Sequence, residues 1–425
     1  MSRTPDRTTS RPRVLILGGG FGGVGAAREL SGADVDVTLV DQHDYHTFQP
    51  LLYQVATDLL EPPTVGHSLR DLFDDEDNVT IHEARVSAID LDRREVEFAD
   101  MAPLGYDYLV LGLGAKVNFF GVDGAAEHAH PLYTLPDAIR LRDHVLERWE
   151  AADRDPALVE DGALSVVIVG GGATGIESAG ALAELYRSIF TKDYPSLPQD
   201  SARIVLVEAG PSLLPMFKAD LRSYTRQALE KRGVEVLTDE VVASIEPTRV
   251  SLKSGTVLRA HTVIWGAGLE AVPLTETLGV ELQRGGRVVT APDLSIPGHP
   301  EVFVVGDIAW IPGEDDHALP QLGSVALQSG GAAGKNAARR VEGKDTIPFS
   351  YHDKGTMATI GRGAAVVQMP HGRTLKGRTA SLAWGAVHLA LLSTGEDRAK
   401  ALLDWTWAGF THERPGRISV SADDK

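Results

Sequence analysis

The fold is decided by residues 14–23, VLILGGGFGG, where an apolar run suited to a buried strand meets a glycine turn. Gly18, Gly20 and Gly23 occupy the three places of the pattern G-x-G-x-x-G. The first glycine allows a sharp turn, the second lets the backbone approach a pyrophosphate, and the third lets a helix pack closely on the strand. Asp41 follows Gly23 by 18 residues, near the ~20 typical of an acid that binds a ribose. The stretch predicts a dinucleotide site more strongly than a purely structural turn.

A second copy of this pattern lies at residues 166–175, VVIVGGGATG. Its three glycines are Gly170, Gly172 and Gly175. Both copies predict strand, glycine turn, helix and strand, which is the first half of a dinucleotide-binding fold. The helix start offers unpaired N–H groups and a positive dipole end to a phosphate.

Glu208 takes the place of the ribose-binding acid in the second copy, but it lies 33 residues after Gly175. The excess length fits an insertion at 191–201, which we expect to be a surface loop. A carboxylate there accepts hydrogen bonds from a ribose diol and repels a 2′-phosphate, so it predicts NADH over NADPH. An ordinary acid at a strand end remains the alternative.

Composition excludes several classes of function. The 425 residues carry a net charge of −18, which argues against a nucleic-acid partner. The chain has no cysteine, so a thiolate nucleophile, a redox disulfide and a Cys-ligated metal are excluded. Histidines such as His128 and His130 have no metal-ligand spacing, and we predict no metal site. The acidic surface fits either a high-salt source or a GC-rich genome.

Two dinucleotide sites in one chain predict a flavoprotein that receives hydride from a nicotinamide. Without cysteine, electrons leave the flavin directly for an external acceptor. The expected fold class is α/β, with two Rossmann-like dinucleotide-binding domains, the FAD domain being interrupted by the NADH domain. The predicted boundaries are 11–140 and 261–345 for the FAD domain, 141–260 for the NADH domain, and 346–425 for a C-terminal region of strands and amphipathic helices.

Several further stretches carry a family resemblance. The most specific is YHTFQPLLYQVA at 45–56, followed by GIE at 175–177, DKG at 353–355, IGR at 360–362 and a Trp-rich C-terminus. Over nearly its whole length the chain resembles the type II NADH:quinone oxidoreductases, single-subunit respiratory flavoenzymes that do not pump protons. Sulfide:quinone and disulfide reductases share this fold but need cysteines.

The resemblance implies two sets of cofactor-binding residues. For FAD they are Gly18, Gly20, Phe21, Gly22, Gly23, Asp41, Gln49, Val86, Gly114, Gly306 and Asp307. For NADH, a substrate, they are Gly170, Gly172, Thr174, Gly175, Glu208 and Gly268. We expect the FAD to be non-covalent, because the chain has no cysteine and no histidine adjoins the glycine turns in sequence.

The resemblance also implies two catalytic residues, Glu177 and Gln328. Glu177 follows the second glycine turn, where the family has a glutamate near both rings that positions groups or handles protons. A helix-dipole role for this acid is the alternative. At the quinone end the family has Ala-Gln and then Gln-Gln, whereas residues 323–330, GSVALQSG, retain only Gln328. The loss of amides leaves the acceptor open: a membrane quinone of the menaquinone type, or a soluble acceptor.

Residues 380–410 contain two segments with mostly Trp and Leu near helical spacing, and basic residues, Arg398, Lys400, Arg414 and Arg417, lie nearby. The first segment has Leu382, Trp384, Val387, His388, Leu391 and Leu392, and the second has Leu402, Leu403, Trp405 and Trp407. This pattern suits two helices lying at a lipid surface. A homodimer interface or a cover over the core is the alternative. No apolar run reaches the roughly 20 residues of a membrane span, and the N-terminus lacks a signal peptide. We therefore expect a peripheral protein on the cytoplasmic side of the cell membrane. A NADH-sensing flavoprotein that acts through a partner is the rival from another class.

Overall fold

The computed structural model describes residues 11–198, 201–313 and 317–411, which belong to two compact units. The first unit comprises Met1–His46, His67–Lys116 and Leu269–His352. The second comprises Thr47–Gly66, Val117–Gly268 and Asp353–Lys425. The chain passes from the first unit to the second after residue 116 and returns to the first after residue 268. The sequence analysis placed these two domain boundaries after residues 140 and 260.

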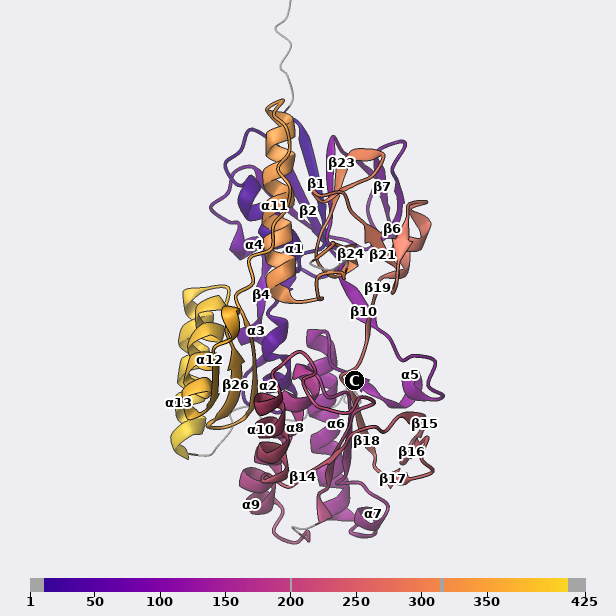
Figure 1. Ribbon diagram of the computed structural model, residues 1–425, viewed down its shortest axis with the longest axis vertical. Helices are drawn as coiled ribbons and strands as arrows, with labels where there is room; N and C mark the ends of the chain where they lie inside the picture. The colour runs from indigo at the N-terminus through magenta and orange to yellow at the C-terminus, as the bar shows by residue number, and fades with distance from the viewer. Residues whose placement is uncertain (1–10, 199–200, 314–316, 412–425) are drawn as a thin grey trace, which may run out of the picture. The chain divides into compact units, whose positions relative to one another are not determined.

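A six-stranded sheet forms the centre of the first unit, with the order β22-β23-β9-β1-β2-β5. Figure 1 labels three of its strands, β23, β1 and β2. The strands are β1 (Arg13–Leu17), β2 (Asp36–Asp41), β5 (Val79–Glu83), β9 (Tyr108–Leu111), β22 (Ser295–Ile296) and β23 (His299–Val304). All neighbours pair in parallel except β22 with β23. The last four residues of β1 are buried, as expected for a parallel strand covered on both faces.

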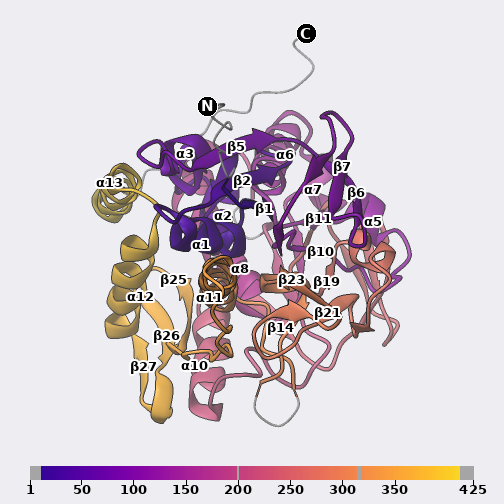
Figure 2. The same ribbon diagram turned by 90° about the horizontal axis from the view of Figure 1, so that it is seen from above.

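Two helices of the first unit, α1 (Phe21–Leu30) and α11 (Gly323–Val341), pack against each other (Figure 2). Glycines permit the close approach, because a Cβ at Gly330 would lie 2.0 Å from the carbonyl oxygen of Gly22. The smaller elements of this unit are α4 (Leu69–Leu72), β6 (Val86–Asp90), β7 (Glu95–Phe98), β8 (Leu104–Gly105), β20 (Leu282–Gln283), β21 (Arg287–Val289), β24 (Ala309–Trp310), and the 3₁₀ turns η4 (Pro273–Thr277) and η5 (Gly306–Ile308). Short strands near the changes of unit are β3 (Tyr45–Thr47), β4 (Gly66–Ser68), β10 (Ala115–Val117) and β19 (Leu269–Ala271).

The second unit repeats the plan with a five-stranded parallel sheet, in the order β11-β18-β12-β13-β14. Its strands are β11 (His130–Pro131), β12 (Val166–Val169), β13 (Ile204–Val207), β14 (Val234–Leu237) and β18 (Thr262–Trp265). An antiparallel sheet consists of β15 (Val242–Glu246), β16 (Arg249–Leu252) and β17 (Val257–Arg259). The two dinucleotide-type α/β units confirm the predicted fold class.

Helices account for the length of the second glycine motif. The helix α8 (Ala173–Leu185) continues as a π-helix, η2 (Tyr186–Phe190), and then as α9 (Thr191–Asp193). The segment expected to be a loop from 191 therefore begins as helix. Before the C-terminal part, this unit also contains the helices η1 (Gln49–Leu51), α2 (Leu52–Ala56), α3 (Pro62–Val65), α5 (Ala125–His128), α6 (Leu135–Arg154), α7 (Ala157–Glu160) and α10 (Ala219–Glu230).

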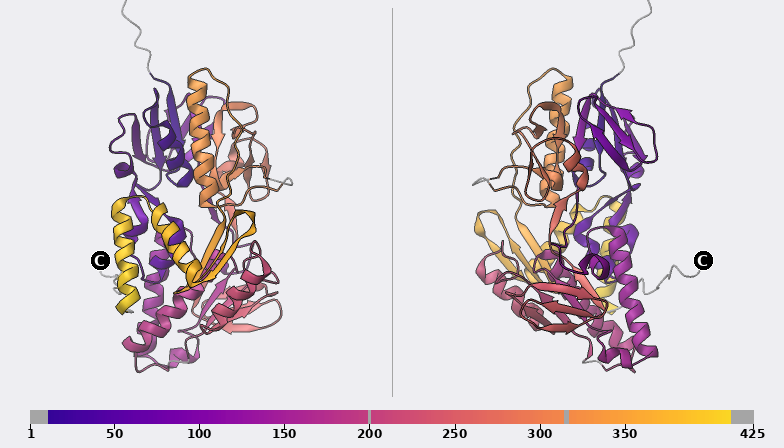
Figure 3. Two further views of the ribbon diagram at one scale, coloured as in Figure 1. Left: turned by 60° about the vertical axis from the view of Figure 1, so that its left-hand side comes forward. Right: turned by 90° about the vertical axis from the view of Figure 1, so that its right-hand side faces the viewer.

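The C-terminal part of the second unit is a three-stranded antiparallel sheet followed by two helices (Figure 3). The sheet contains β25 (Thr356–Gly361), β26 (Ala364–Gln368) and β27 (Thr374–Gly377), and β25 packs on α8. The helices α12 (Arg378–Leu391) and α13 (Gly395–Thr411) match the two predicted segments and the break between them. In the ranges that the structure describes, no helix is both long and apolar enough to cross a bilayer.

Candidate functional site

The first glycine turn joins β1 to α1 in the geometry that its sequence pattern requires. Gly18 has a φ of +103°, and a Cβ there would lie 2.3 Å from the carbonyl oxygen of Gly112. A Cβ at Gly23 would lie 1.7 Å from the carbonyl oxygen of Gly18, so the helix passes directly over the strand. Gly20 caps α1, and a Cβ there would meet no described heavy atom within 4 Å. The open space and the N–H groups at this helix start fit a dinucleotide pyrophosphate.

Asp41 closes this turn from the end of β2. One carboxylate oxygen accepts a hydrogen bond from the N–H of Gly19 at 2.6 Å, and the other accepts one from the N–H of His43 at 2.8 Å. Burial raises the pKa of Asp41, and these two N–H groups oppose the rise. The carboxylate is thus fixed beside the turn, where a carboxylate binds ribose hydroxyls in dinucleotide folds.

His46 is a residue beside this turn that the sequence analysis missed as a site residue. Its Nδ1 lies 2.9 Å from the carbonyl oxygen of Gly19, and a carbonyl can only accept, so Nδ1 carries the proton. The ring also packs edge-on against Phe21, with 5.0 Å between the ring centres. Burial lowers the pKa of His46 to about 4, which keeps the ring neutral. No histidine adjoins the turn in sequence, but the fold brings this one against it.

The other flavin candidates of the first unit lie at several strand ends. Gly114 follows β9 with a φ of +74°. Gly306 follows β23 with a φ of +67°, and its N–H donates to the hydroxyl of Ser329 at 3.1 Å. Asp307 lies in η5, where its backbone carbonyl accepts a hydrogen bond from the side chain of Gln321 at 3.0 Å. Val86 begins β6, next in sequence to β5.

One flavin candidate, Gln49, belongs to the second unit. Its side-chain amide donates to the carbonyl oxygen of Tyr133 at 3.5 Å. The first unit therefore contains the other ten of the predicted flavin residues, while Gln49 stays a prediction that rests on the family resemblance.

The second glycine turn reproduces the first one closely. Gly170 has a φ of +112°, and a Cβ at Gly175 would lie 1.9 Å from the carbonyl oxygen of Gly170. Gly172 caps α8, and a Cβ there would have no described heavy atom within 4 Å. Thr174 is half-buried in the first turn of α8. This turn has the same open approach for a pyrophosphate as its counterpart.

Glu208 has the same position relative to the second glycine turn as Asp41 has relative to the first. Its two carboxylate oxygens accept hydrogen bonds from the N–H groups of Gly171 and Gly210, each at 2.6 Å. A carboxylate has about four acceptor positions, so these two bonds leave capacity for ribose hydroxyls. Gly268 follows the neighbouring strand β18 with a φ of +71°. The structure thus brings Gly170, Gly175 and Glu208 together as the sequence predicted.

Glu177 is buried in α8, with only 8% of its surface exposed. The carboxyl accepts a hydrogen bond from the backbone N–H of Thr359 in β25 at 3.2 Å. Burial raises the pKa of Glu177 to about 8, and the N–H of Thr359 and the indole of Trp384 offset part of the rise. At neutral pH this carboxyl therefore retains its proton, which the sequence alone did not predict.

Gln328 makes a two-point contact within the first unit. Its amide nitrogen donates to the carbonyl oxygen of His352 at 3.1 Å, and its amide oxygen accepts from the N–H of the same residue at 3.0 Å. These bonds hold the chain at residue 352. They support an anchoring role, and contact of Gln328 with a quinone stays a prediction.

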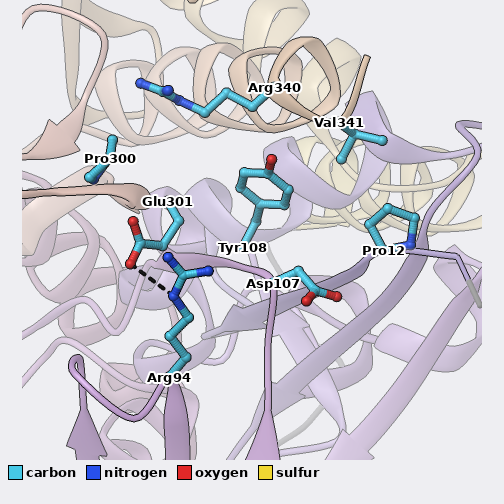
Figure 4. A pocket seen from close by; sticks show the side chains of 8 residues that line it. All are labelled: Pro12, Arg94, Asp107, Tyr108, Pro300, Glu301, Arg340 and Val341. Carbon is cyan, nitrogen blue, oxygen red and sulfur yellow. Dashed lines mark ion pairs between the residues drawn. The ribbon is translucent and has the colours of Figure 1, made fainter. Parts of the chain in front are cut away.

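A separate hollow of about 570 Å³ lies at the amino ends of the strands in the first sheet, away from the glycine turn (Figure 4). Two of its charged side chains, Arg94 and Glu301, point toward each other and form an ion pair at 3.2 Å. Arg340, also in its wall, pairs with Asp293 at 3.5 Å. In the described ranges, no group of three or more His, Cys, Asp or Glu side chains is arranged to hold a metal ion.

A comparison with protein families agrees with this geometry. Residues 12–330 match the family model of the pyridine nucleotide-disulphide oxidoreductases. Family membership implies a flavin and a nicotinamide nucleotide, and the two open glycine turns fit two such dinucleotides. The absence of cysteine from the sequence excludes the disulphide step that gives this family its name.

Individual proteins are similar over nearly the full length. The chain is 36% identical to the type II NADH:quinone oxidoreductase NdhA of Mycobacterium tuberculosis, over 99% of this chain and 92% of that protein. It is 31% identical to the type II NADH:quinone oxidoreductase of Staphylococcus haemolyticus, over 87% of this chain and 92% of that one. Among solved structures, NDH2 of Plasmodium falciparum in complex with NADH has the same fold, with a TM-score of 0.86 and 20% identity over 96% of this chain and 100% of that chain.

Proposed function

Because the chain belongs to the family of type II NADH:quinone oxidoreductases, we propose that it oxidises NADH and passes two electrons to a quinone through non-covalent FAD, without pumping protons. The observation that carries this proposal is the pair of matched glycine turns, each closed by a carboxylate on its own backbone N–H groups. We assign one turn to a resident dinucleotide and the other to a dinucleotide that exchanges.

We assign the turn at Gly18, Gly20 and Gly23, with Asp41, to FAD. All three positions are glycine. Gly18 allows the turn, Gly23 allows the helix to cross the strand, and Gly20 leaves the approach to the turn open. When bound, the flavin supplies the hydride acceptance and electron transfer. The chain contributes the N–H groups at the start of α1, which bind the pyrophosphate, and Asp41, which binds a ribose.

We assign the turn at Gly170, Gly172 and Gly175 to NADH. Glu208 accepts hydrogen bonds from the ribose diol there and disfavours the 2′-phosphate of NADPH, because a second negative charge would lie beside its carboxylate. The short bonds from Gly171 and Gly210 hold that carboxylate in position before the substrate arrives.

Glu177 is the group that we assign to proton handling. Reduction of a quinone by two electrons takes up two protons, so a carboxyl that is protonated at neutral pH is a suitable donor. The raised pKa of Glu177, about 8, meets that requirement, and its cause is burial. A carboxyl with an ordinary pKa would be ionised at pH 7 and would have no proton to give.

We further propose that α12 and α13 lie on a membrane surface, on its cytoplasmic side, and that the quinone is of the menaquinone type. These helices expose a set of large apolar side chains, Leu382, Val387, Leu391, Leu402, Leu403, Trp407 and Phe410. Apolar side chains in contact with water are typical of a surface that binds lipid or another protein. A second copy of this chain is the alternative occupant.

The test is steady-state oxidation of NADH by the purified, flavin-loaded protein with long-tailed quinones, short soluble quinones, ferricyanide and oxygen. We expect the long-tailed quinones to support turnover in lipid vesicles. Turnover with soluble acceptors alone would replace the membrane quinone with a soluble acceptor. Slow turnover with every acceptor, together with a change of partner binding on reduction, would favour a NADH sensor.

A further inference from the structure

Trp384 lies in α12, which packs on β25, the strand whose Thr359 donates its backbone N–H to the carboxyl of Glu177. The indole is 6% exposed and it lowers the pKa of the buried carboxyl. Its N–H nevertheless makes no hydrogen bond of regular geometry with any described atom. A buried N–H without a partner costs free energy, and an ionised carboxylate accepts hydrogen bonds better than a neutral carboxyl does. Ionisation of Glu177 therefore offers this N–H a partner.

His388 holds the indole in place, one helical turn further along α12. Its Nδ1 lies 2.8 Å from the carbonyl oxygen of Trp384, and since the carbonyl can only accept, Nδ1 is the donor. The imidazole also stacks on the indole, with 4.1 Å between ring centres and 23° between planes. Burial lowers the pKa of His388 to about 4, so the ring stays neutral in this stack.

A second tryptophan completes the cluster from α13. The ring of Trp405 lies 5.8 Å from that of Trp384, and its own N–H donates to the side chain of Gln54 at 2.7 Å. Trp405 thus has a partner other than Glu177, which separates its chemistry from that of Trp384.

We propose that Trp384 is a hydrogen-bond donor kept for the ionised form of Glu177, that His388 is the positioning residue for it, and that the pair sets the pH at which Glu177 releases its proton. The proposal deepens the proposed function, because it rests on Glu177 as the proton donor to the quinone. It assigns to α12 a role in the chemistry besides that of a surface helix.

Few other groups around Glu177 can change the pH at which it releases its proton. The helix α8 packs against α2, α10, β12, β13, β14 and β25, and α12 lies over β25 and β26. Among the described residues the interactions that shift the proton affinity of Glu177 are its burial, the N–H of Thr359 and the indole of Trp384, with no charged side chain. The titratable groups nearest in the aromatic cluster are His388 and Tyr53, which contact Trp384. Of the two opposing N–H groups, only that of Trp384 belongs to a side chain and can be removed.

The experiment is an infrared pH titration of the carboxyl C=O band in the flavin-loaded full chain. The band of Glu177 is identified by its loss in Glu177→Gln. In Trp384→Phe, which keeps a ring and removes the N–H, we expect the midpoint to rise by about half to one pH unit, the size of one hydrogen bond. His388→Leu, which removes the hydrogen bond and the ring stack that hold the indole, should also raise the midpoint. The control is Trp405→Phe, which should leave the midpoint unchanged.

Two results would overturn the proposal. The first is an unchanged midpoint in Trp384→Phe, and the second is an equal rise in Trp405→Phe, which would mean that any loosening of the cluster has the same effect. Circular dichroism and flavin content check each variant for folding, and His388→Leu provides the test if Trp384→Phe does not fold. The titration needs no turnover, so a wild-type protein that fails to reduce quinones would refute the proposed function and leave this measurement readable.

Discussion

Glu208 accepts a hydrogen bond from the N–H of Gly171 at 2.6 Å, the same distance that joins Asp41 to the N–H of Gly19. The two carboxylates differ in length by one methylene and close equivalent turns in different units. The same arrangement of a glycine turn and a carboxylate therefore occurs once in each unit, and a substitution can change one arrangement and leave the other intact.

The first prediction uses this pair to test donor specificity. Glu208→Gln should narrow the ratio of kcat/KM for NADH over that for NADPH, because the charge that repels a 2′-phosphate is removed. We expect a change of about tenfold, since 1.4 kcal/mol is a reasonable size for a charge beside a phosphate in partly exposed surroundings. Steady-state kinetics with both nucleotides measure it.

The matched control for that prediction is Asp41→Asn in the first unit. It should lower the flavin content of the purified protein and leave the NADH to NADPH ratio unchanged in the fraction that retains flavin. If Glu208→Gln left the ratio as in the wild type, another residue would read the ribose.

The second prediction separates binding from folding at the glycines. Gly172→Ala should fold normally, because its Cβ would meet no described heavy atom within 4 Å, yet it should raise KM for NADH by filling the approach of the pyrophosphate. Gly175→Ala should instead lower the melting temperature, because its Cβ would lie 1.9 Å from the carbonyl oxygen of Gly170. Thermal unfolding and NADH kinetics on both variants distinguish the two effects, and an equal loss of stability would contradict the assignment.

The third prediction concerns the flavin link. Acid precipitation should release FAD into the supernatant, because the chain has no cysteine and no histidine adjoins the glycine turns in sequence. Absorbance of the supernatant and of the pellet measures the outcome. Flavin that remains with the pellet would mean a covalent link, and His46→Ala would then test this histidine as its site.

The fourth prediction follows from the pKa of Glu177, which burial raises from 4.5 to about 8. The folded carboxyl binds its proton more tightly than the unfolded one, so stability from this group is greatest below pH 4.5 and falls as the pH rises to about 8. Glu177→Gln should remove that fall and unfold in more urea than the wild type at pH 8.5, but not at pH 4.5. Urea unfolding at both pH values is the measurement, with the exposed Glu246→Gln as a control that should change neither.

The fifth prediction tests the membrane surface with exposed residues alone. Truncation of α12 would uncover Glu177, so point changes are sharper. Leu403→Ser combined with Phe410→Ser should release the protein from vesicles and reduce turnover with long-tailed quinones more than with short ones, because lipid contact scales with buried apolar area. Val257→Ser, which changes an exposed apolar residue of β17, is the control and should keep binding. An equal loss with both kinds of quinone would contradict delivery through the membrane.

The sequence predicted the two C-terminal helices but not which of their residues are buried. The helical spacing correctly indicated two helices and the break between them, but it grouped Leu382, Trp384 and His388 on one apolar stripe. In the structure Leu382 is exposed, whereas Trp384 and His388 are buried. Spacing identifies apolar positions on a helix, but the packing of β25 and β26 decides which of them face inward.

The sequence by itself determined the two glycine turns, their acids and the α/β plan of both units. The turn from Gly18 to Gly23 depends on backbone freedom and on contacts within one strand-turn-helix segment. Both depend on residues that are close together in the sequence, so the local pattern is enough to predict the turn. The tertiary structure alone decided that His46 bonds Gly19, that Gln328 holds His352, and that the carboxyl of Glu177 is buried and affected by the indole of Trp384. These side chains meet partners far away in the sequence, and burial by distant segments, rather than local pattern, sets the proton affinity of Glu177.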